Sequence, residues 1–132
     1  MKFLCLICAE KVMEQMTAAD AERHYREYES FMEEIGKSGH YLGCNRLLPP
    51  ATATTVRVRN GKVSATDGPY AETKEQLGGY FLIEARDRSE AVQVAARIPG
   101  AWIGCVEVRP VAEDPRTLEM LKAAAPGSAG KE

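Results

Sequence analysis

The sequence of 132 residues has little of what marks a specialised class of protein. Aromatic residues make up 7% of it, histidine occurs twice, and no apolar run approaches the roughly 20 residues that a membrane-spanning helix needs. The net charge is only -2, with both signs interspersed, so no basic surface for nucleic acid or an anionic membrane is indicated. We therefore expect no nucleic-acid partner and no membrane association.

Cysteines are also few, and their spacing does not predict a metal site or a disulfide. Cys5 and Cys8 form a C-x-x-C, but they lie in the apolar run FLCLIC, which is typical of a strand. Residues three apart on a strand point to opposite faces of the sheet. Because there is no second pair of this kind, we predict buried free thiols, no metal and no cofactor.

The composition that is present, 45% hydrophobic and 27% charged, is typical of one soluble globular domain. In the N-terminal segment charges return at Glu10 and Lys11, before any small-residue cleavage site. This pattern predicts a first strand rather than a signal peptide, and a cytoplasmic protein.

Apolar patterning and turn residues predict alternating strands and helices. The expected strands cover residues 2–8, 41–48, 79–85 and 103–108, with the last at a sheet edge because Pro110 follows it. A first helix begins at Thr17, with Asp20 three residues later, and ends at Gly36 and Gly39; a second begins at Asp87 or Ser89 and ends at Pro99-Gly100. The expected buried stripes are Ala21, Tyr25, Tyr28, Met32 and Ile35, then Ala91, Val92, Ala95 and Ile98.

Residues 54–66 predict a β-hairpin around Asn60-Gly61, the preferred two-residue type I′ turn. This turn places Val58 opposite Val63 and Val56 opposite Ala65, so one face of the hairpin is apolar.

The predicted elements follow the order of two βαβ halves: strand, helix, strand, inserted hairpin, strand, helix, strand. It predicts an α+β protein of the ferredoxin-like βαββαβ type, an antiparallel sheet with both helices on one face. The open face is then too apolar for solvent, and a face-to-face homodimer is the simplest way to cover it. We expect this domain to span residues 1–112, followed by a short helix over 113–125 and a disordered tail over 126–132.

Three segments carry a resemblance to a known family: "DGPYAETKEQLGGYFLIEA", "PPATATTVRVRNGK" and "VEVRPV". Over residues 1–112 the chain resembles the YCII-related family, in the branch named for its DGPF motif, with Tyr70 in the phenylalanine position. The resemblance implies a ferredoxin-like fold dimerised through its sheets, within the dimeric α+β barrel superfamily, which includes lactone isomerases and monooxygenases.

The resemblance also bears on catalytic residues. YCII-like proteins resemble one another in a histidine on the first helix, paired with an aspartate and proposed as an acid-base dyad. Here Tyr28 stands at the matching position, and His24 lies one turn earlier on the same face. Members of the DGPF branch often have genes beside extracytoplasmic-function sigma factors, which implies a regulatory setting.

The DGPF-like stretch holds the other candidate residues. Asp67 is either the cap of a turn or a carboxylate held at the mouth of a cleft, and Tyr70 is either an anchor on the core or a pocket wall. Glu72 and Lys74 form surface charge pairs or bind a substrate. We predict a partly exposed His24; its alternative is a hydrogen bond to Asp67.

Three functions follow, the last of which is a structural dimer in which the motif only folds its loop. The first is a cofactor-free small-molecule enzyme with acid-base chemistry in a cleft between the sheet and the first helix. Asp67 would be its base; Tyr28, His24 or Tyr70 would orient the substrate, with Glu72 and Lys74 as further binding residues. The second is a ligand-binding or accessory module linked to extracytoplasmic-function sigma-factor regulation.

Overall fold

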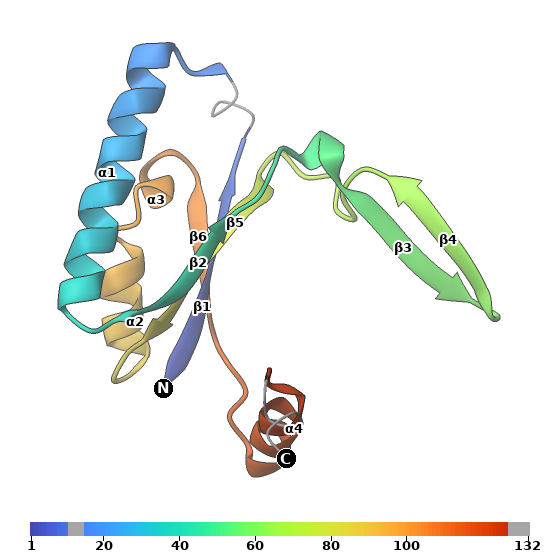
Figure 1. Cartoon of the computed structure of the whole chain (residues 1–132). Helices are drawn as coiled ribbons and strands as arrows, with labels where there is room; N and C mark the ends of the chain where they lie inside the picture. The colour runs from blue at the N-terminus through green and yellow to red at the C-terminus, as the bar shows by residue number, and fades with distance from the viewer. Residues whose placement is uncertain (11–14, 127–132) are drawn as a thin grey trace.

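A computed structural model describes residues 1–10 and 15–126 of the chain. Its main sheet is antiparallel, with the strand order β2-β5-β1-β6. The strands are β1 (Lys2–Ala9), β2 (Tyr41–Arg46), β5 (Gln76–Glu84) and β6 (Cys105–Pro110). Helices α1 (Ala18–Lys37), α2 (Arg88–Ala95) and α3 (Gly100–Ile103) lie on one side of this sheet (Figure 1). The predicted α+β fold is thus confirmed, and the strand order is consistent with a ferredoxin-like arrangement.

The hydrophobic core lies between the sheet and these helices. Along β1, the buried Phe3 and Cys5 face the helices, while Leu4 and Leu6 point to the opposite face. The core continues through Phe31, Ile35, Phe81, Ile83, Ala91, Val94 and Ile98. The opposite face of the sheet, where Leu4 pairs with Leu82, is covered by none of α1, α2 and α3.

Helix α1 begins where the sequence predicts, because the Thr17 hydroxyl accepts a hydrogen bond from the Asp20 N–H at 3.1 Å. Its predicted buried stripe is partly wrong. Tyr25 and Met32 are 55% and 38% exposed, and the buried residues are His24, Phe31 and Ile35. Two of the predicted positions, 25 and 32, thus lie one residue away from the buried positions 24 and 31.

Helix α2 is capped by Asp87, whose side chain accepts from the Glu90 N–H. The buried stripe of this helix differs from the predicted one at one residue, because Val94 is buried and Val92 is 46% exposed. Pro99-Gly100 does not end helical structure, because the short α3 begins at Gly100. Strand β6 follows at the edge of the sheet, as predicted.

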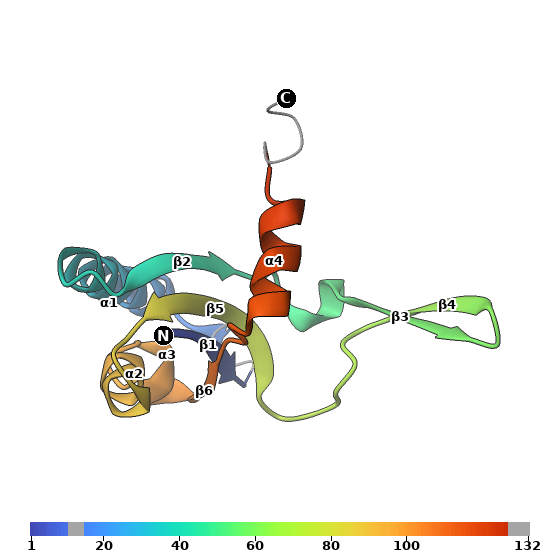
Figure 2. The same ribbon diagram turned by 90° about the horizontal axis from the view of Figure 1, so that it is seen from below.

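The inserted hairpin consists of β3 (Thr54–Arg59) and β4 (Lys62–Asp67), and we call it the arm. Its register is the predicted one, with Val58 opposite Val63, and Asn60 and Gly61 take φ values of 52° and 75°. The arm projects on the side of the sheet away from the helices (Figures 1 and 2). The helix η2 (Pro50–Thr52) precedes it.

Helix α4 (Pro115–Ala124), capped by Asp114, also extends from the side of the sheet opposite the other helices (Figure 2). Its Leu118, Met120 and Leu121 are exposed. The tail predicted for 126–132 lies, from residue 127 onward, outside the described residues.

The cysteines are free thiols. Cys5 is fully buried, and burial raises the pKa of its thiol to about 11. Cys8 points to the opposite face and lies directly across from Cys105 on β6. The prediction that the thiols are buried is wrong for Cys105, which is exposed on an edge strand. The described residues contain no cluster of three or more potential metal ligands. Among them, no helix has the length and apolar character needed to cross a membrane.

Candidate functional site

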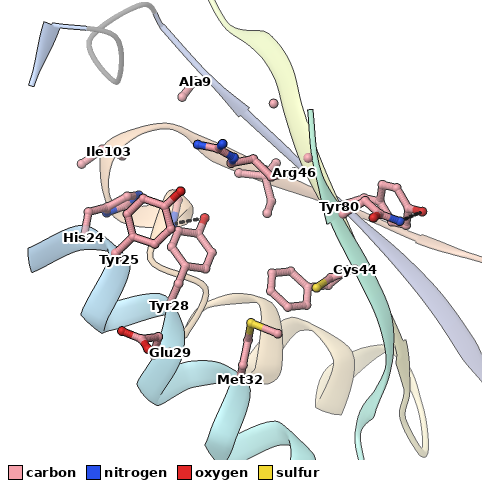
Figure 3. A pocket seen from close by; sticks show the side chains of 16 residues that line it. Ala9, His24, Tyr25, Tyr28, Glu29, Met32, Cys44, Arg46, Tyr80 and Ile103 are labelled. Carbon is pink, nitrogen blue, oxygen red and sulfur yellow. Dashed lines mark hydrogen bonds between the residues drawn. The ribbon is translucent and has the colours of Figure 1, made fainter. Parts of the chain in front are cut away.

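A pocket of about 500 Å³ lies between α1 and the ends of strands β1, β2 and β5 (Figure 3). Its wall is largely apolar and aromatic, and its size is within the range of small-molecule sites in proteins. The lining residues are Ile7, Ala9, His24, Tyr25, Tyr28, Glu29, Met32, Cys44, Asn45, Arg46, Gly78, Gly79, Tyr80, Phe81, Gly100 and Ile103. This is the cleft between sheet and first helix in which the sequence predicts chemistry.

His24 is the buried titratable group of this pocket. Its side chain is 11% exposed, and the buried Nε2 atom has no hydrogen-bond partner among the described residues. The other ring nitrogen, Nδ1, lies 3.6 Å from a carboxylate oxygen of Glu27 on the same helix. A buried polar atom without a partner costs roughly 1–3 kcal/mol, so such an atom in a cavity indicates a place where a ligand group or water binds.

The expectation that His24 is partly exposed is wrong. The α-helical period places residues 24, 28, 31 and 35 on one side of the helix, and this side faces the sheet. The ring packs edge-on against Tyr28, with the two centroids 5.0 Å apart.

Tyr28 stands beside His24 as a neutral hydrogen-bonding group. Burial raises the pKa of its phenol, and the backbone N–H of Gly100, which donates to the phenol oxygen at 3.1 Å, partly offsets this rise. Because that oxygen accepts from Gly100, the phenol O–H is still able to donate to a ligand. The ring stacks on Phe81, 6.3 Å away between centroids, which fixes its orientation.

Glycines allow the backbone to come close to this site. A Cβ atom on Gly100 would lie 2.5 Å from Ile7 Cγ2 and 2.7 Å from the Tyr28 hydroxyl. A Cβ on Gly79 would lie 2.8 Å from the carbonyl oxygen of Asn45, so the backbones of β5 and β2 come close together here. The pairing of β1 with β5 also shifts next to Gly79, between Ile7 and Cys8.

The structure separates Asp67 from the pocket. Asp67 is exposed at the end of β4, pairs with Thr54 in the arm, and is not a lining residue. Among the described residues no group donates a hydrogen bond to its carboxylate. The neighbouring Gly68, with φ of 103°, carries the turn instead: its N–H donates to Ala53 and its carbonyl accepts from Thr55.

Tyr70, Glu72 and Lys74 also lie away from the pocket. Tyr70 is 80% exposed, so it is not an anchor on the core, and the guanidinium carbon of Arg57 lies 5.7 Å from its ring centroid. Glu72 and Lys74 are exposed. Their loop is ordered by Gln76, whose amide donates to the carbonyl oxygens of Ala71 and Thr73, both at 2.8 Å.

Sequence reasoning missed several pocket residues. The sequence places Arg46 and Phe81 in strands and Met32 on a helix face, without a site role. No motif joins these residues, because they come from three separate elements, β2, β5 and α1. The one available signal was the spacing of His24 and Tyr28, four residues apart on a helix face that also carries core residues.

Comparison with known proteins gives the family of the chain. The family model for the YCII-related domain matches residues 1–114. The chain is also similar to an uncharacterized protein of Rhizobium meliloti (strain 1021), with 34% identity over 105 residues. That match covers 78% of this chain and 85% of the Rhizobium protein.

Proposed function

The chain belongs to the YCII-related family, and from the geometry of its pocket we propose that it is a small-molecule enzyme that moves protons. The observation that carries this proposal is the buried His24 in the wall of a largely apolar pocket, with an Nε2 atom that has no hydrogen-bond partner among the described residues. Imidazole is the side chain that most readily exchanges protons near neutral pH. His24 is the proposed acid-base residue, and the reaction is an isomerisation that begins with removal of a proton from a C–H group and needs no cofactor.

The neighbours of His24 fit this role. Once the imidazole has taken a proton, the Glu27 carboxylate beside Nδ1 stabilises its charge, as a carboxylate does in other histidine-carboxylate pairs. Tyr28 donates a hydrogen bond to an oxygen of the bound molecule. The apolar wall excludes water, which strengthens both electrostatic interactions.

The role first expected for Asp67 stays a prediction, as do the substrate-binding roles of Tyr70, Glu72 and Lys74. Their distance from the lining of the pocket leads us to give the acid-base step to His24 and to give the DGPF-like loop, through Gly68 and Gln76, the task of holding the base of the arm. Asp67→Ala is therefore expected to keep any activity that depends on the pocket.

Deuterium exchange tests the acid-base role without knowledge of the substrate. The protein is incubated in D₂O with mixtures of metabolites that carry acidic C–H groups, and deuterium uptake is measured by mass spectrometry. We expect at least one compound to exchange with the wild type, and His24→Gln to slow that exchange about a hundredfold or more.

The matched control is His40→Gln. His40 is the second histidine of the chain and does not line the pocket; its Nδ1 forms a hydrogen bond with the Ser38 hydroxyl. Thermal melting of each variant confirms that it folds. The proposal fails if His24→Gln exchanges as fast as the wild type, or if no compound exchanges with the wild type.

We also propose a homodimer that covers the open face of the sheet. Leu4, Leu6 and Leu82 point to this face, and the arm and α4 project on the same side (Figures 1 and 2). Sedimentation velocity tests this proposal. The cytoplasmic location stays a prediction, which cell fractionation would test.

The second candidate is a ligand-binding or accessory module in sigma-factor regulation. The exposed valines of the arm favour it, because a surface of this kind suits a protein partner. In that case a compound would bind the pocket and change the melting temperature without any exchange or turnover in the deuterium experiment.

A further inference from the structure

Arg46 is a charged residue of the pocket that the proposed acid-base step does not use. It is the last residue of β2, and its guanidinium carbon lies 5.9 Å from the ring centroid of Tyr25 on α1. Figure 3 shows its side chain reaching over the pocket from the strand side toward Tyr25 and His24. Arg46 thus bridges the mouth of the cleft.

No carboxylate neutralises Arg46 within the described part of the chain. Five other arginines do form ion pairs, namely Arg23, Arg26, Arg86, Arg97 and Arg109. The acidic lining residue, Glu29, is not within ion-pair distance of Arg46, and Figure 3 shows its carboxylate directed away from the guanidinium. A guanidinium held on an aromatic ring presents a planar set of donors that matches a carboxylate.

The rest of the wall defines the other part of a ligand. Aliphatic and aromatic surface comes from Ile7, Met32, Phe81 and Ile103. His24 and Tyr28 add polar side chains to the wall. Asn45 is already engaged, since its amide donates to the Tyr80 hydroxyl at 2.8 Å. A molecule that fits has a compact apolar skeleton and one negative group.

We propose that the pocket binds small organic acids with a ring-sized apolar skeleton, and that Arg46 pairs with the carboxylate of the ligand at the mouth of the cleft. This inference rests on the pocket of the proposed function but does not depend on catalysis by His24. It assigns Arg46 to recognition and leaves the inner end of the ligand facing His24 and Tyr28.

Matched pairs of neutral and anionic probes test the inference by isothermal titration calorimetry. The probes are benzoate, phenylacetate, cyclohexanecarboxylate and 1-naphthoate, each with its primary amide. We expect at least one acid to bind the wild type about tenfold or more tightly than its amide, because a charge-assisted bond to a carboxylate is lost in the amide. Arg46→Gln should reduce the affinity for the acid to that for the amide.

Arg57→Gln is the matched control, because Arg57 lies over Tyr70 at 5.7 Å in the arm and so copies the local geometry of Arg46 outside the pocket. It should keep the full preference for the acid. Equal binding of acid and amide by the wild type, an unchanged preference in Arg46→Gln, or no binding of any acid in the panel would overturn the inference.

His24→Gln separates this inference from the proposed function. A preference for acids that persists in the wild type and in His24→Gln, with no deuterium exchange in either protein, would retain the ligand class and reject the enzyme. Deuterium exchange that depends on His24, with no preference for acids over amides, would retain the enzyme and reject the ligand class.

Discussion

At the scale of the residue, the site depends as much on missing side chains as on present ones. Gly100 has no Cβ, and this lets α3 approach both Ile7 and the Tyr28 hydroxyl, to which its N–H donates. That contact holds a phenol with a raised pKa next to the His24 imidazole. Neither periodicity nor motif indicates such a role, because the sequence of a glycine after a proline is equally typical of a simple helix end.

Replacing Gly100 with alanine should therefore damage the site. The new methyl group meets atoms at 2.5 and 2.7 Å, so Ile7 and Tyr28 must move, and we expect a loss of about 1–3 kcal/mol in the free energy of unfolding. Urea unfolding measures this change, and weaker binding of the probe acids should accompany it.

Gly36→Ala is the control for the Gly100 variant. Gly36 lies within α1, and a Cβ there would meet no atom within 4 Å. Because glycine is unfavourable inside a helix, the change should stabilise the protein by about 0.5–1 kcal/mol. A Gly100→Ala protein as stable as Gly36→Ala would show that the close approach at Gly100 does not constrain the site.

At the scale of the element, the local sequence predicts the first residues of the helices and the hairpin turn correctly, but it predicts the buried faces of the helices only in part. Thr17, Asp87 and Asn60-Gly61 form the predicted caps and turn because each acts through hydrogen bonds or φ values within a few residues. The predicted buried stripes include Tyr25 and Val92, which are exposed in the structure. Residues at the edge of a buried stripe are next to exposed positions in the sequence. Whether such a residue is buried depends on the distance between the helix and the sheet.

The arm is the element whose role the single chain leaves open. A two-stranded hairpin is at best marginally stable in water on its own, and its Val56, Val58 and Val63 are 62%, 56% and 71% exposed. In the proposed homodimer the arm lies against the second copy. Val63→Ser should then raise the dimer dissociation constant about tenfold or more, because burial of a valine contributes roughly 1.5–3 kcal/mol.

Lys62→Ser is the control, since Lys62 is adjacent in β4 and its side chain points to the other face of the arm. We expect this change to leave the dissociation constant almost unaltered. Analytical ultracentrifugation over a range of protein concentrations measures both. The same constant for the wild type and Val63→Ser would exclude the valine face from the dimer contact.

At the scale of the whole molecule, the chain exposes more surface than a compact monomer of its mass. Its accessible surface is 9671 Å², whereas a compact monomer of 14.5 kDa exposes about 6,900 Å². The excess of roughly 2,800 Å² is large enough for each copy to contribute to a stable dimer interface. The open sheet face, the arm and α4 lie on one side of the sheet, so a second copy could contact all three (Figures 1 and 2).

We accordingly predict that the protein sediments as a species of twice 14.5 kDa at micromolar concentration. A melting temperature that rises with protein concentration should accompany this, because association stabilises the folded chains by mass action. A species of 14.5 kDa at every concentration, with a constant melting temperature, would contradict the dimer.

The sequence by itself determined the α+β class, the order of the elements, the hairpin register and the resemblance to the YCII-related family. These features depend on interactions between residues close in the chain and on a repeated alternation of apolar positions, both of which can be read along one dimension. Only the tertiary structure decided which residues share the pocket. It joined His24, Tyr28, Arg46 and Gly100 from two helices and one strand, because their contacts depend on how far α1 and α3 stand from the sheet. Asp67 lies outside the pocket because it belongs to the arm. That distance is fixed by packing between elements remote in the sequence, to which no local pattern corresponds.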